Sequence, residues 1–580
     1  MTGTPTEIAR VSEVLGSKIR ADLLPGIAGS APLYRGRIYR IGQVGSLVRI
    51  PLGPQELLGG VTMLGISEGQ DGDRRWLEIE LLGEINSFGR FSRGVTSYPS
   101  LDDPVHFATE EIYAKIFPEP TQEHVAIGRL ASVSASQPVT VDLAKFVLRH
   151  SAVLGSTGSG KTSAVASLLQ SIVAAGLGNA NIVVIDPHAE YVAALGAWSE
   201  VHSVHVDGGL LVPYWALGLE DLLKVFATPG NVEPVPRMAF AEEVTKERQD
   251  FLRSLTDPWL QPEAATVDTP VPFDLREVWF RLDTANRATY PDKPGEPPQV
   301  PSVDELGDAK YLRPTRFTPH SMGNQPPHKG AKYGYYGSVP GRIRGHLADA
   351  RFRFLTDTHP VPGSPDPLPG YIDGWLGRAR PISILDFSGI PGDVADVAIG
   401  VVLQLLLEVA IHSNDTAGIG RARPVLLVLE EAHRFIGPDA SSTLAKSAVE
   451  RIAREGRKYG LGLMLVSQRP SELSATALAQ CGTIVALRLT NPQDQAIVRA
   501  ALPDSLAGLS ELLPSLKTGE AVVSGEAIAL PTRIAIRRPS PEPHAADPSL
   551  GSWIGDGRSN DVVEAVSRWR SGMRSSGDGK

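Results

Sequence analysis

Cysteine is almost absent from this 580-residue chain, which contains only Cys481. A disulfide framework within the chain and a cysteine-based zinc site are therefore excluded, and a reducing, cytoplasmic location is expected. Because Cys481 precedes an apolar strand-like segment, we expect it to be a core residue rather than a reactive thiol.

Long uninterrupted apolar runs are missing as well. The longest run, residues 394–411, contains Asp396, Gln404 and Glu408. A membrane span rarely tolerates three such groups, so this run predicts a buried core helix. Neither a membrane anchor nor a signal peptide is expected.

An excess of positive charge is also lacking, since 56 Lys and Arg residues accompany 65 Asp and Glu residues. The net charge of −9 excludes a protein coated in basic surface, but it leaves room for a basic patch confined to one groove. With 42% hydrophobic and 21% charged residues, the composition is that of a globular protein. At about 150 residues per domain, the length predicts about three domains.

Glycine is concentrated in the stretch AVLGSTGSGKTS at residues 152–163. Its spacing is that of a phosphate loop, G-x-x-x-x-G-K-S/T, in which backbone N–H groups surround the phosphates. The preceding HSAVLG predicts a strand and the following KTSAVASLLQSIVAAG predicts a helix, as this motif requires. We therefore predict an ATP site in which Lys161 contacts the β and γ oxygens and Thr162 binds Mg²⁺. The candidate nucleotide-binding residues are Gly155, Ser156, Thr157, Gly158, Ser159, Gly160, Lys161, Thr162 and Ser163.

Two acids follow a later apolar strand, in PVLLVLEEAHRF at residues 424–435. Glu430 and Glu431 come at the carboxyl end of this run, which is where ligands bind in open α/β sheets. We predict that Glu430 binds the metal and that Glu431 polarises the attacking water. The first acid of such a pair is usually aspartate, so the division of roles stays open. Both carboxylates could instead favour the N-terminus of the following helix.

Four more short apolar segments have the character of central strands. They are NIVVID (181–186), PISILDFSG (381–389), GLGLMLVSQ (460–468) and GTIVALRL (482–489). With helical patterns between them, they predict a doubly wound α/β fold with a mostly parallel sheet. Gln468 ends the third segment and is predicted to sense the γ-phosphate, and a surface glutamine without a role is the alternative.

A basic amphipathic helix is predicted over VERIAREGRKYGLG, residues 449–462. Its cations are Arg451, Arg454, Arg457 and Lys458. Phosphoryl transfer is accelerated by an arginine delivered to the γ-phosphate, often from a neighbouring subunit. A solvated basic helix end, favoured by the helix dipole, is the alternative.

Seven segments, in order, resemble the HerA family of hexameric DNA translocases, relatives of FtsK. They are LGSTGSGKT, VVIDPHAEY, VPYWAL, ILDFSGIP, LEEAHRF, REGRKYGLGLMLVSQRP and LRLTNPQDQ. The resemblance implies a RecA-like P-loop ATPase core, a homo-hexamer and double-stranded DNA as substrate. It implies that Arg149 and Arg457 act on nucleotide, at least one of them across a subunit boundary. It also places Asp186 and Glu190 near the nucleotide.

The expected organisation follows from these segments. Alternating apolar patterns at residues 39–53 and 74–85 predict strands similar to the small β-barrel that begins this family. The predicted units are a barrel at 1–145, a RecA-like core at 146–219 and 376–540, an inserted helical and irregular subdomain at 220–375, and a tail at 541–580.

The function implied by the resemblance is ATP-driven translocation on duplex DNA, with a NurA-like nuclease or another effector such as a sirtuin-like NADase. DNA end processing and antiviral defence are both compatible with it. The alternative is an oligomeric ATPase scaffold that assembles and activates an effector, with translocation secondary.

A local reversal of charge marks residues 310–355, where nine cations accompany a single acid, Asp349. The cations are Lys310, Arg313, Arg316, Lys329, Lys332, Arg342, Arg344, Arg351 and Arg353. Sequence-independent DNA binding needs such residues, and KYGYYGS adds aromatic groups. A solvated face or a surface for an acidic partner are the alternatives.

Overall fold

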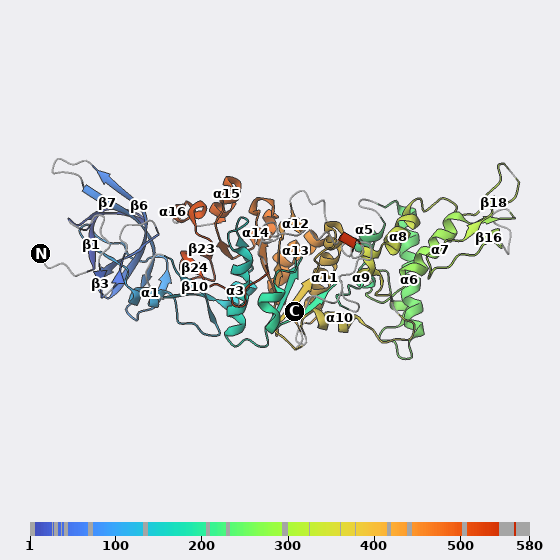
Figure 1. Cartoon of the computed structure of the whole chain (residues 1–580), viewed down its shortest axis with the longest axis horizontal. Helices are drawn as coiled ribbons and strands as arrows, with labels where there is room; N and C mark the ends of the chain where they lie inside the picture. Colours follow the sequence, from blue (N-terminus) through green and yellow to red (C-terminus); the bar gives the residue numbers. More distant parts are fainter. Residues whose placement is uncertain are drawn as a thin grey trace, which may run out of the picture.

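The computed structural model describes most of the chain. It covers residues 6–544 except 26, 28–32, 36, 40–44, 68–73, 132–136, 205–208, 228–231, 293–299, 324, 360, 378, 414–418, 438–443 and 502–506, and beyond 544 only residues 562, 563 and 566. The predicted tail at 541–580 therefore lies almost entirely outside the described residues. Figure 1 shows an elongated molecule with the N-terminal strands at one end, a large central sheet in the middle and an extended arm at the other end.

The N-terminal strands form a closed barrel, as predicted. Its strands are β1 (Glu7–Leu15), β2 (Lys18–Leu23), β5 (Leu47–Leu52), β6 (Gln55–Ser67), β7 (Arg74–Ile85) and β9 (Pro104–Phe107). Their order is β2-β1-β9-β5-β6-β7, and β2 pairs back with β7, so that the ring has no free edge. Side chains that alternate along the strands, including Ile50, Leu57 and Ile79, fill the interior. Outside the ring lie β3 (Leu33–Tyr34), β4 (Arg37–Ile38) and β8 (Phe91–Arg93).

The central sheet has eleven strands and is mostly parallel. Its parallel part, in spatial order, is β22 (Thr483–Ala486), β12 (Ser151–Leu154), β21 (Leu461–Ser467), β20 (Val425–Leu429), β13 (Asn181–Asp186), β19 (Ile382–Asp386) and β14 (Ser199–Ser203). An antiparallel extension adds β23 (Glu520–Gly525), β24 (Thr532–Ile536), β10 (His124–Leu130) and β11 (Pro138–Asp142). Every central strand predicted from the sequence is present, and the fold is the predicted α/β fold with a mostly parallel sheet.

Helices cover both faces of this sheet because successive strand residues point to opposite sides. Ile182 and Val184 pack on the face of α3 (Lys161–Ala174), whereas Val183 and Ile185 pack on the face of α11 (Gly392–His412) and α13 (Leu444–Glu455). The other core helices are α1 (Glu110–Ile116), α2 (Leu143–Leu148), α4 (Val192–Leu195), α12 (His433–Ile436), α14 (Ala475–Ala479), α15 (Pro492–Ala501) and α16 (Ala507–Ser510).

The long apolar run is a core helix, as its interrupting polar residues predicted. Within α11, the stretch Val394–His412 is apolar and long enough to cross a membrane, but 67% of it is buried inside the protein. Gln404 donates a hydrogen bond to Glu408, and Arg451 of α13 also contacts Glu408 at 2.5 Å. Gln404 and Glu408 thus form a polar contact between α11 and α13.

Two details differ from the expectations. Strands β10 and β11, which the sequence division placed with the barrel in 1–145, instead join the central sheet through β24. The basic helix ends at Glu455, and Arg457 and Lys458 lie in a 3₁₀ turn, Gly456–Tyr459, rather than on the helix. This turn ends at Gly460, whose φ of +77° and close approach to Gly420 require glycine.

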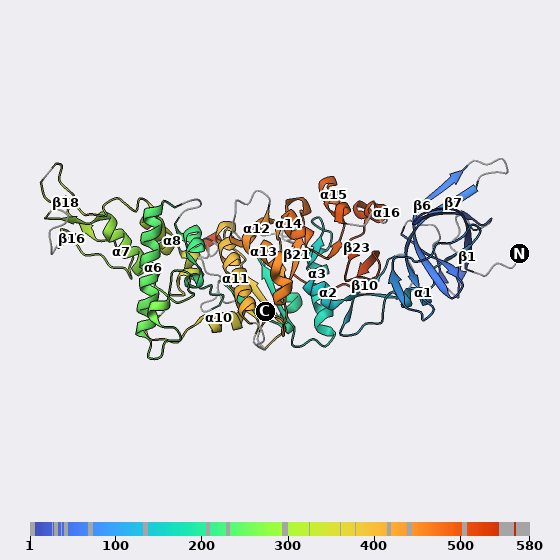
Figure 2. The ribbon, with the colours of Figure 1, turned by 180° about the vertical axis from the view of Figure 1, so that it is seen from behind.

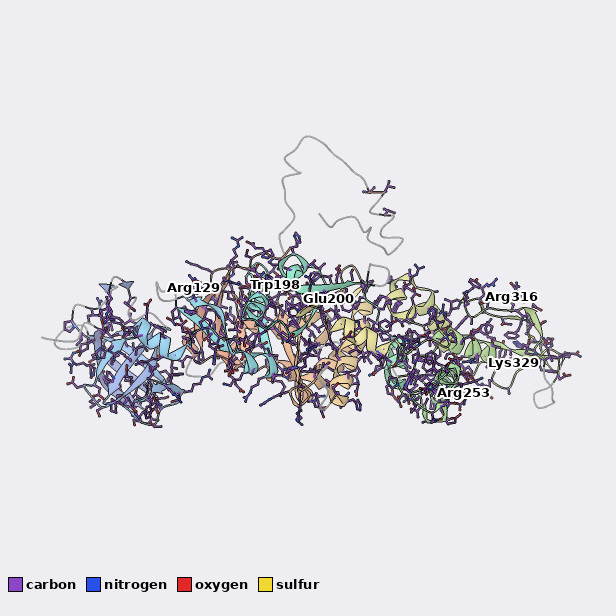
Figure 3. All side chains as sticks on the ribbon, turned by 90° about the horizontal axis from the view of Figure 1, so that it is seen from below. Arg129, Trp198, Glu200, Arg253, Arg316 and Lys329 are labelled. Carbon is purple, nitrogen blue, oxygen red and sulfur yellow. The ribbon has the colours of Figure 1, made fainter. Side chains whose placement is uncertain are left out.

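The inserted residues form a helical bundle that extends into an arm, as Figure 1 and the reverse view in Figure 2 show. The helices are α5 (Leu219–Phe226), α6 (Pro234–Ser254), α7 (Leu275–Arg287), α8 (Val339–Ala348), α9 (Arg353–Thr356) and α10 (Leu368–Trp375). The arm contains two small antiparallel two-stranded sheets, β15 (Thr289–Tyr290) with β18 (His328–Lys329), and β16 (Val303–Glu305) with β17 (Arg316–Phe317). Arg316 and Lys329 lie at its far end in Figure 3.

Candidate nucleotide site

The glycine-rich stretch forms a tight loop between β12 and α3. Gly158 and Gly160 have φ values of +72° and +90°, which side chains other than glycine rarely adopt. A Cβ on Gly155 would lie 2.6 Å from the Ser159 hydroxyl oxygen and 2.9 Å from Leu487 Cβ. Each of these glycines is therefore required by the backbone. The loop ends at the N-terminus of α3, a position that favours phosphate, and Ser163 lies in the first turn of that helix.

Residues after β22 fix this loop in place. The Ser156 N–H donates to the Arg488 carbonyl at 2.9 Å, and the Thr490 N–H donates to the Ser156 hydroxyl at 3.2 Å. The Arg488 guanidinium donates to the Gly158 carbonyl at 3.1 Å. The segment LRLTNPQDQ thus acts as a support for the phosphate loop.

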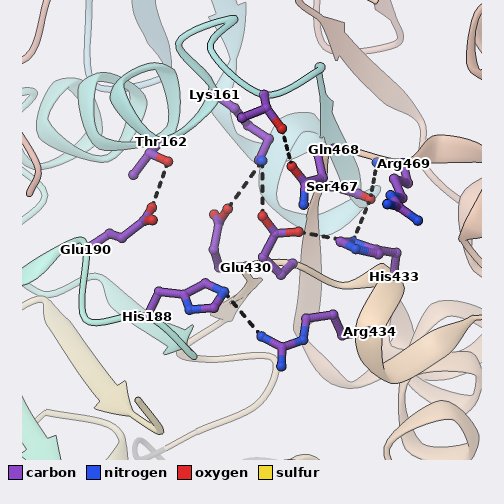
Figure 4. A network of polar contacts seen from close by, with 12 residues as sticks. Lys161, Thr162, His188, Glu190, Glu430, His433, Arg434, Ser467, Gln468 and Arg469 are labelled. Atoms are coloured by element: carbon purple, nitrogen blue, oxygen red, sulfur yellow. Dashed lines mark hydrogen bonds and ion pairs between the residues drawn. The ribbon is translucent and has the colours of Figure 1, made fainter. Parts of the chain in front are cut away.

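Lys161 lies between the two predicted acids (Figure 4). Its ammonium nitrogen is 3.4 Å from Glu431 Oε1 and 3.8 Å from Glu430 Oε1. All three side chains are buried to about nine-tenths or more. The parallel register of β12, β21 and β20 brings the loop and both acids to the carboxyl edge of the sheet, as the sequence predicted.

Glu430 occupies a position suited to a metal-binding carboxylate. Burial raises its pKa to about 8, although the nearby ammonium of Lys161 opposes this shift. The Tyr191 hydroxyl donates to Glu430 Oε2, while Oε1 faces Lys161. A divalent cation would offset the cost of ionising this buried group.

Thr162 is held by a third acid. Its hydroxyl donates to Glu190 Oε2 at 2.9 Å. The described residues contain no group of three or more His, Cys, Asp or Glu side chains arranged for a metal. Mg²⁺ bound with a nucleotide needs only one or two protein ligands besides phosphate and water, so the oxygens of Thr162 and Glu430 fit it.

Glu431 has a strained backbone and an unsatisfied oxygen. Its φ is +51°, in the left-handed region that costs about 1–3 kcal/mol for a residue other than glycine. Its Oε2 is buried, lacks a hydrogen-bond partner among the described residues, and lies 3.1 Å from His433 Nδ1. Burial lowers the pKa of His433, although the charge of Glu431 opposes this shift.

Gln468 connects the end of β21 to the phosphate loop. Its Oε1 accepts a hydrogen bond from the Thr157 hydroxyl at 2.6 Å. Beside it, the Ser467 hydroxyl lies 3.3 Å from His433 Nδ1. A polar cavity of about 540 Å³ opens next to Ser156, Thr157 and Gln468, so this end of the site is accessible from outside the chain.

The two predicted arginines lie at the amino ends of the parallel strands, on the opposite side of the sheet from the phosphate loop. Arg149 immediately precedes the β12 region, caps α2 and pairs with Glu526, and Arg457 is exposed in the turn before β21. Arg457 also adds its charge to the burial that lowers the pKa of His150, the residue that follows Arg149. The four residues of β12 alone span about 13 Å, so neither arginine reaches the phosphate loop of its own chain.

Family models match most of the ATPase core described above. The model described as "Helicase HerA, central domain" matches residues 125–406, and "Helicase HerA-like C-terminal" matches residues 417–538. The chain belongs to the HerA family. A probable helicase of Methanocaldococcus jannaschii is 26% identical to this HerA-family chain over 553 residues, covering 90% of this chain and 91% of the relative.

Two further similarities place this HerA-family chain among known proteins. The DNA double-strand break repair helicase HerA of Pyrococcus furiosus is 27% identical over 428 residues, covering 69% of this chain and 67% of the relative. The structure of VirB4 of Thermoanaerobacter pseudethanolicus is 14% identical, with a TM-score of 0.46 over 73% of this chain and 97% of that chain. Together with the phosphate loop, the family places this protein among the P-loop ATPases.

The sequence analysis of this HerA-family protein did not name Tyr191 and His433 as site residues, and it placed Asp186 near the nucleotide without a role. Asp186 accepts hydrogen bonds from the backbone N–H groups of His188 and Tyr191, both at 3.1 Å, so it shapes the turn that carries Glu190. Tyr191 and His433 each contact a predicted acid and were not named. Their only signal in the sequence is that they stand one or two residues from Glu190 and Glu431.

Proposed function

We propose that this HerA-family ATPase assembles into a hexameric ring and uses ATP hydrolysis to move along double-stranded DNA. One observation carries the proposal. Lys161, Glu430 and Glu431 meet at the carboxyl ends of the parallel strands, whereas Arg149 and Arg457 precede the amino ends of β12 and β21. In a ring, the arginine edge of one subunit faces the phosphate loop of the next and completes its site.

The proposed roles follow from the geometry. Lys161 contacts the β and γ oxygens of ATP, and Thr162 with Glu430 holds Mg²⁺, which neutralises phosphate charge when bound. Glu431 orients the water and accepts its proton through Oε2. Gln468, tied to Thr157, senses the γ-phosphate. The arginine from the neighbouring subunit stabilises charge on the phosphoryl group.

A second candidate function is an ATP-dependent scaffold for an effector enzyme. It is favoured by the hairpin of β6 and β7, which projects from the barrel in Figure 1. On this hairpin Met63, Leu64 and Ile66 are each more than half exposed. A NurA-like nuclease or a sirtuin-like NADase is the proposed partner, in DNA end processing or antiviral defence. A cytoplasmic location is part of both proposals.

ATP hydrolysis with and without DNA separates the two functions. We expect linear duplex DNA to raise the hydrolysis rate of the purified ring several-fold, because translocation requires DNA to control phosphoryl transfer. A single-stranded oligonucleotide of equal length is the control and should stimulate less. A rate that is indifferent to DNA but rises with the effector would contradict the translocase and support the scaffold.

A further inference from the structure

The arm carries a group of exposed cations, which we call the basic tip: Lys310, Arg313, Arg316, Lys329 and Lys332. All five are exposed. Two of them, Arg316 and Lys329, lie toward the end of the molecule opposite the barrel (Figure 3), where Figure 1 places β16 and β18. The two small sheets of the arm are linked by Thr289 of β15, whose hydroxyl donates to the carbonyl of Thr318, the residue after β17, at 2.7 Å. The group is therefore displayed on an ordered element.

The acids near the tip neutralise it only in part. Residues 310–355 contain nine cations and one acid, Asp349. Three further acids, Asp304, Glu305 and Asp308, precede this segment, so residues 303–355 contain four acids in all. Arg313 and Arg316 lie 3.9 Å from Asp308 and Glu305. Such long, exposed pairs are weak, so a phosphate competes with them readily.

The lysines of the tip, unlike Arg313 and Arg316, have no carboxylate partner among the described residues. Among the residues that the structure describes, no carboxylate oxygen lies within 4.0 Å of the ammonium of Lys310, Lys329 or Lys332. Three such ammonium groups on one small element give this part of the arm a net positive surface. A polyanion is the partner that such a surface fits.

The arginines closer to the bundle have structural contacts instead. Arg342 donates to the Ala227 carbonyl at 3.4 Å, and Arg344 donates to the Leu312 carbonyl at 3.0 Å. Arg344 also stacks over the Trp279 ring at 5.9 Å. Arg351 pairs with Asp349 at 2.6 Å. These contacts remove Arg342, Arg344 and Arg351 from the DNA surface predicted for the nine cations. Arg353 is exposed but belongs to α9 of the bundle, so the proposed surface is restricted to the five cations of the tip.

Tyrosines lie among the cations of the tip. Lys310 and Arg313 lie 5.7 and 5.5 Å from the Tyr311 ring, and Lys329 lies 5.2 Å from the Tyr333 ring. Tyr311 is 64% exposed and Tyr335 is 60% exposed. Exposed tyrosine hydroxyls and cations are the groups that contact phosphate and sugar in duplex DNA.

We propose that the basic tip is a DNA-backbone contact separate from the ATPase core, which holds duplex DNA at the end of the ring opposite the barrel. The inference rests on the proposed translocation function. The contact is independent of sequence, because phosphates carry no sequence information. A ring presents several tips to one duplex, so weak single contacts add together.

The test is the full-length variant Lys310→Gln/Lys329→Gln/Lys332→Gln, with duplex binding measured at several salt concentrations. We expect weaker binding to all sequences and a salt slope shallower by about 0.9 for each phosphate that the variant no longer neutralises. Basal ATP hydrolysis and ring size should not change. The matched control Lys224→Gln/Lys246→Gln/Arg253→Gln removes the same charge from exposed positions on α5 and α6 and should bind DNA as the wild type does.

Two results would overturn the proposal. Unchanged affinity and salt slope in an assembled ring would remove the tip from DNA binding. Unchanged DNA binding with loss of a co-purifying protein would make the tip a protein-docking surface. Failure of the translocase proposal itself is distinguishable, because it appears in the wild type as hydrolysis that DNA does not stimulate.

Discussion

The variant Glu431→Gln should bind ATP with wild-type affinity and hydrolyse it about 10²–10⁴-fold more slowly. The amide keeps the size of the side chain but cannot accept the proton of the attacking water at the buried oxygen that lies 3.1 Å from His433 Nδ1. Lys161→Ala should lose binding as well as turnover, because the ammonium that contacts the phosphates is removed. Equilibrium binding of a fluorescent ATP analogue and single-turnover hydrolysis measure the two effects separately.

The control for this pair is Glu455→Gln, which removes a carboxylate at the end of α13, 3.9 Å from Arg451 and away from the loop. It should leave binding and turnover unchanged. Turnover by Glu431→Gln equal to that of the wild type would show that another group activates the water.

Removal of the arginine that acts across the subunit boundary should lower turnover about 10³-fold or more while ATP binding is retained. Arg457→Ala and Arg149→Ala are the two candidates, because both side chains lie at the sheet edge remote from their own loop. Arg454→Ala is the matched control, since Arg454 lies on α13 near Glu450 and should be dispensable.

Mixed rings then test action in trans. A ring that combines Arg457→Ala chains with Glu431→Gln chains contains interfaces in which an intact acid pair meets an intact arginine, so some hydrolysis should return. The same experiment with Arg149→Ala identifies which arginine is responsible. Absence of rescue at every mixing ratio, with mixed rings demonstrated by mass, would count against a shared site.

Much of the core could be predicted because its signals are local. A strand buried on both faces is a continuous apolar run, and β13, β20 and β21 follow their predicted segments within a residue or two. The phosphate loop depends on a fixed spacing within one turn of chain. Because the carboxyl ends of parallel strands lie at the same side of a sheet, these local signals predicted that Lys161, Glu430 and Glu431 lie close together.

The remainder depended on contacts between distant segments. The pairing of β10 with β24 joins residues about 400 positions apart, and no local pattern shows that these strands leave the barrel. The Tyr191 hydroxyl meets Glu430 only after β13 and β20 pair. The helix that carries Arg454 ends at Glu455, because Gly456 and Gly460 favour a turn there. The regular spacing of the basic residues continues past this point, and the sequence prediction therefore extended the helix too far.

Displacement of a third strand from linear duplex DNA is the most direct measurement of the central claim, which is that hydrolysis at this site moves the protein along DNA. A triplex-forming oligonucleotide placed at a distance from the loading end reports arrival of the ring. The account predicts ATP-dependent release by the wild type, with a delay that lengthens with distance, and no release by Glu431→Gln. DNA-stimulated hydrolysis without release at any distance, or release by Glu431→Gln, would contradict it.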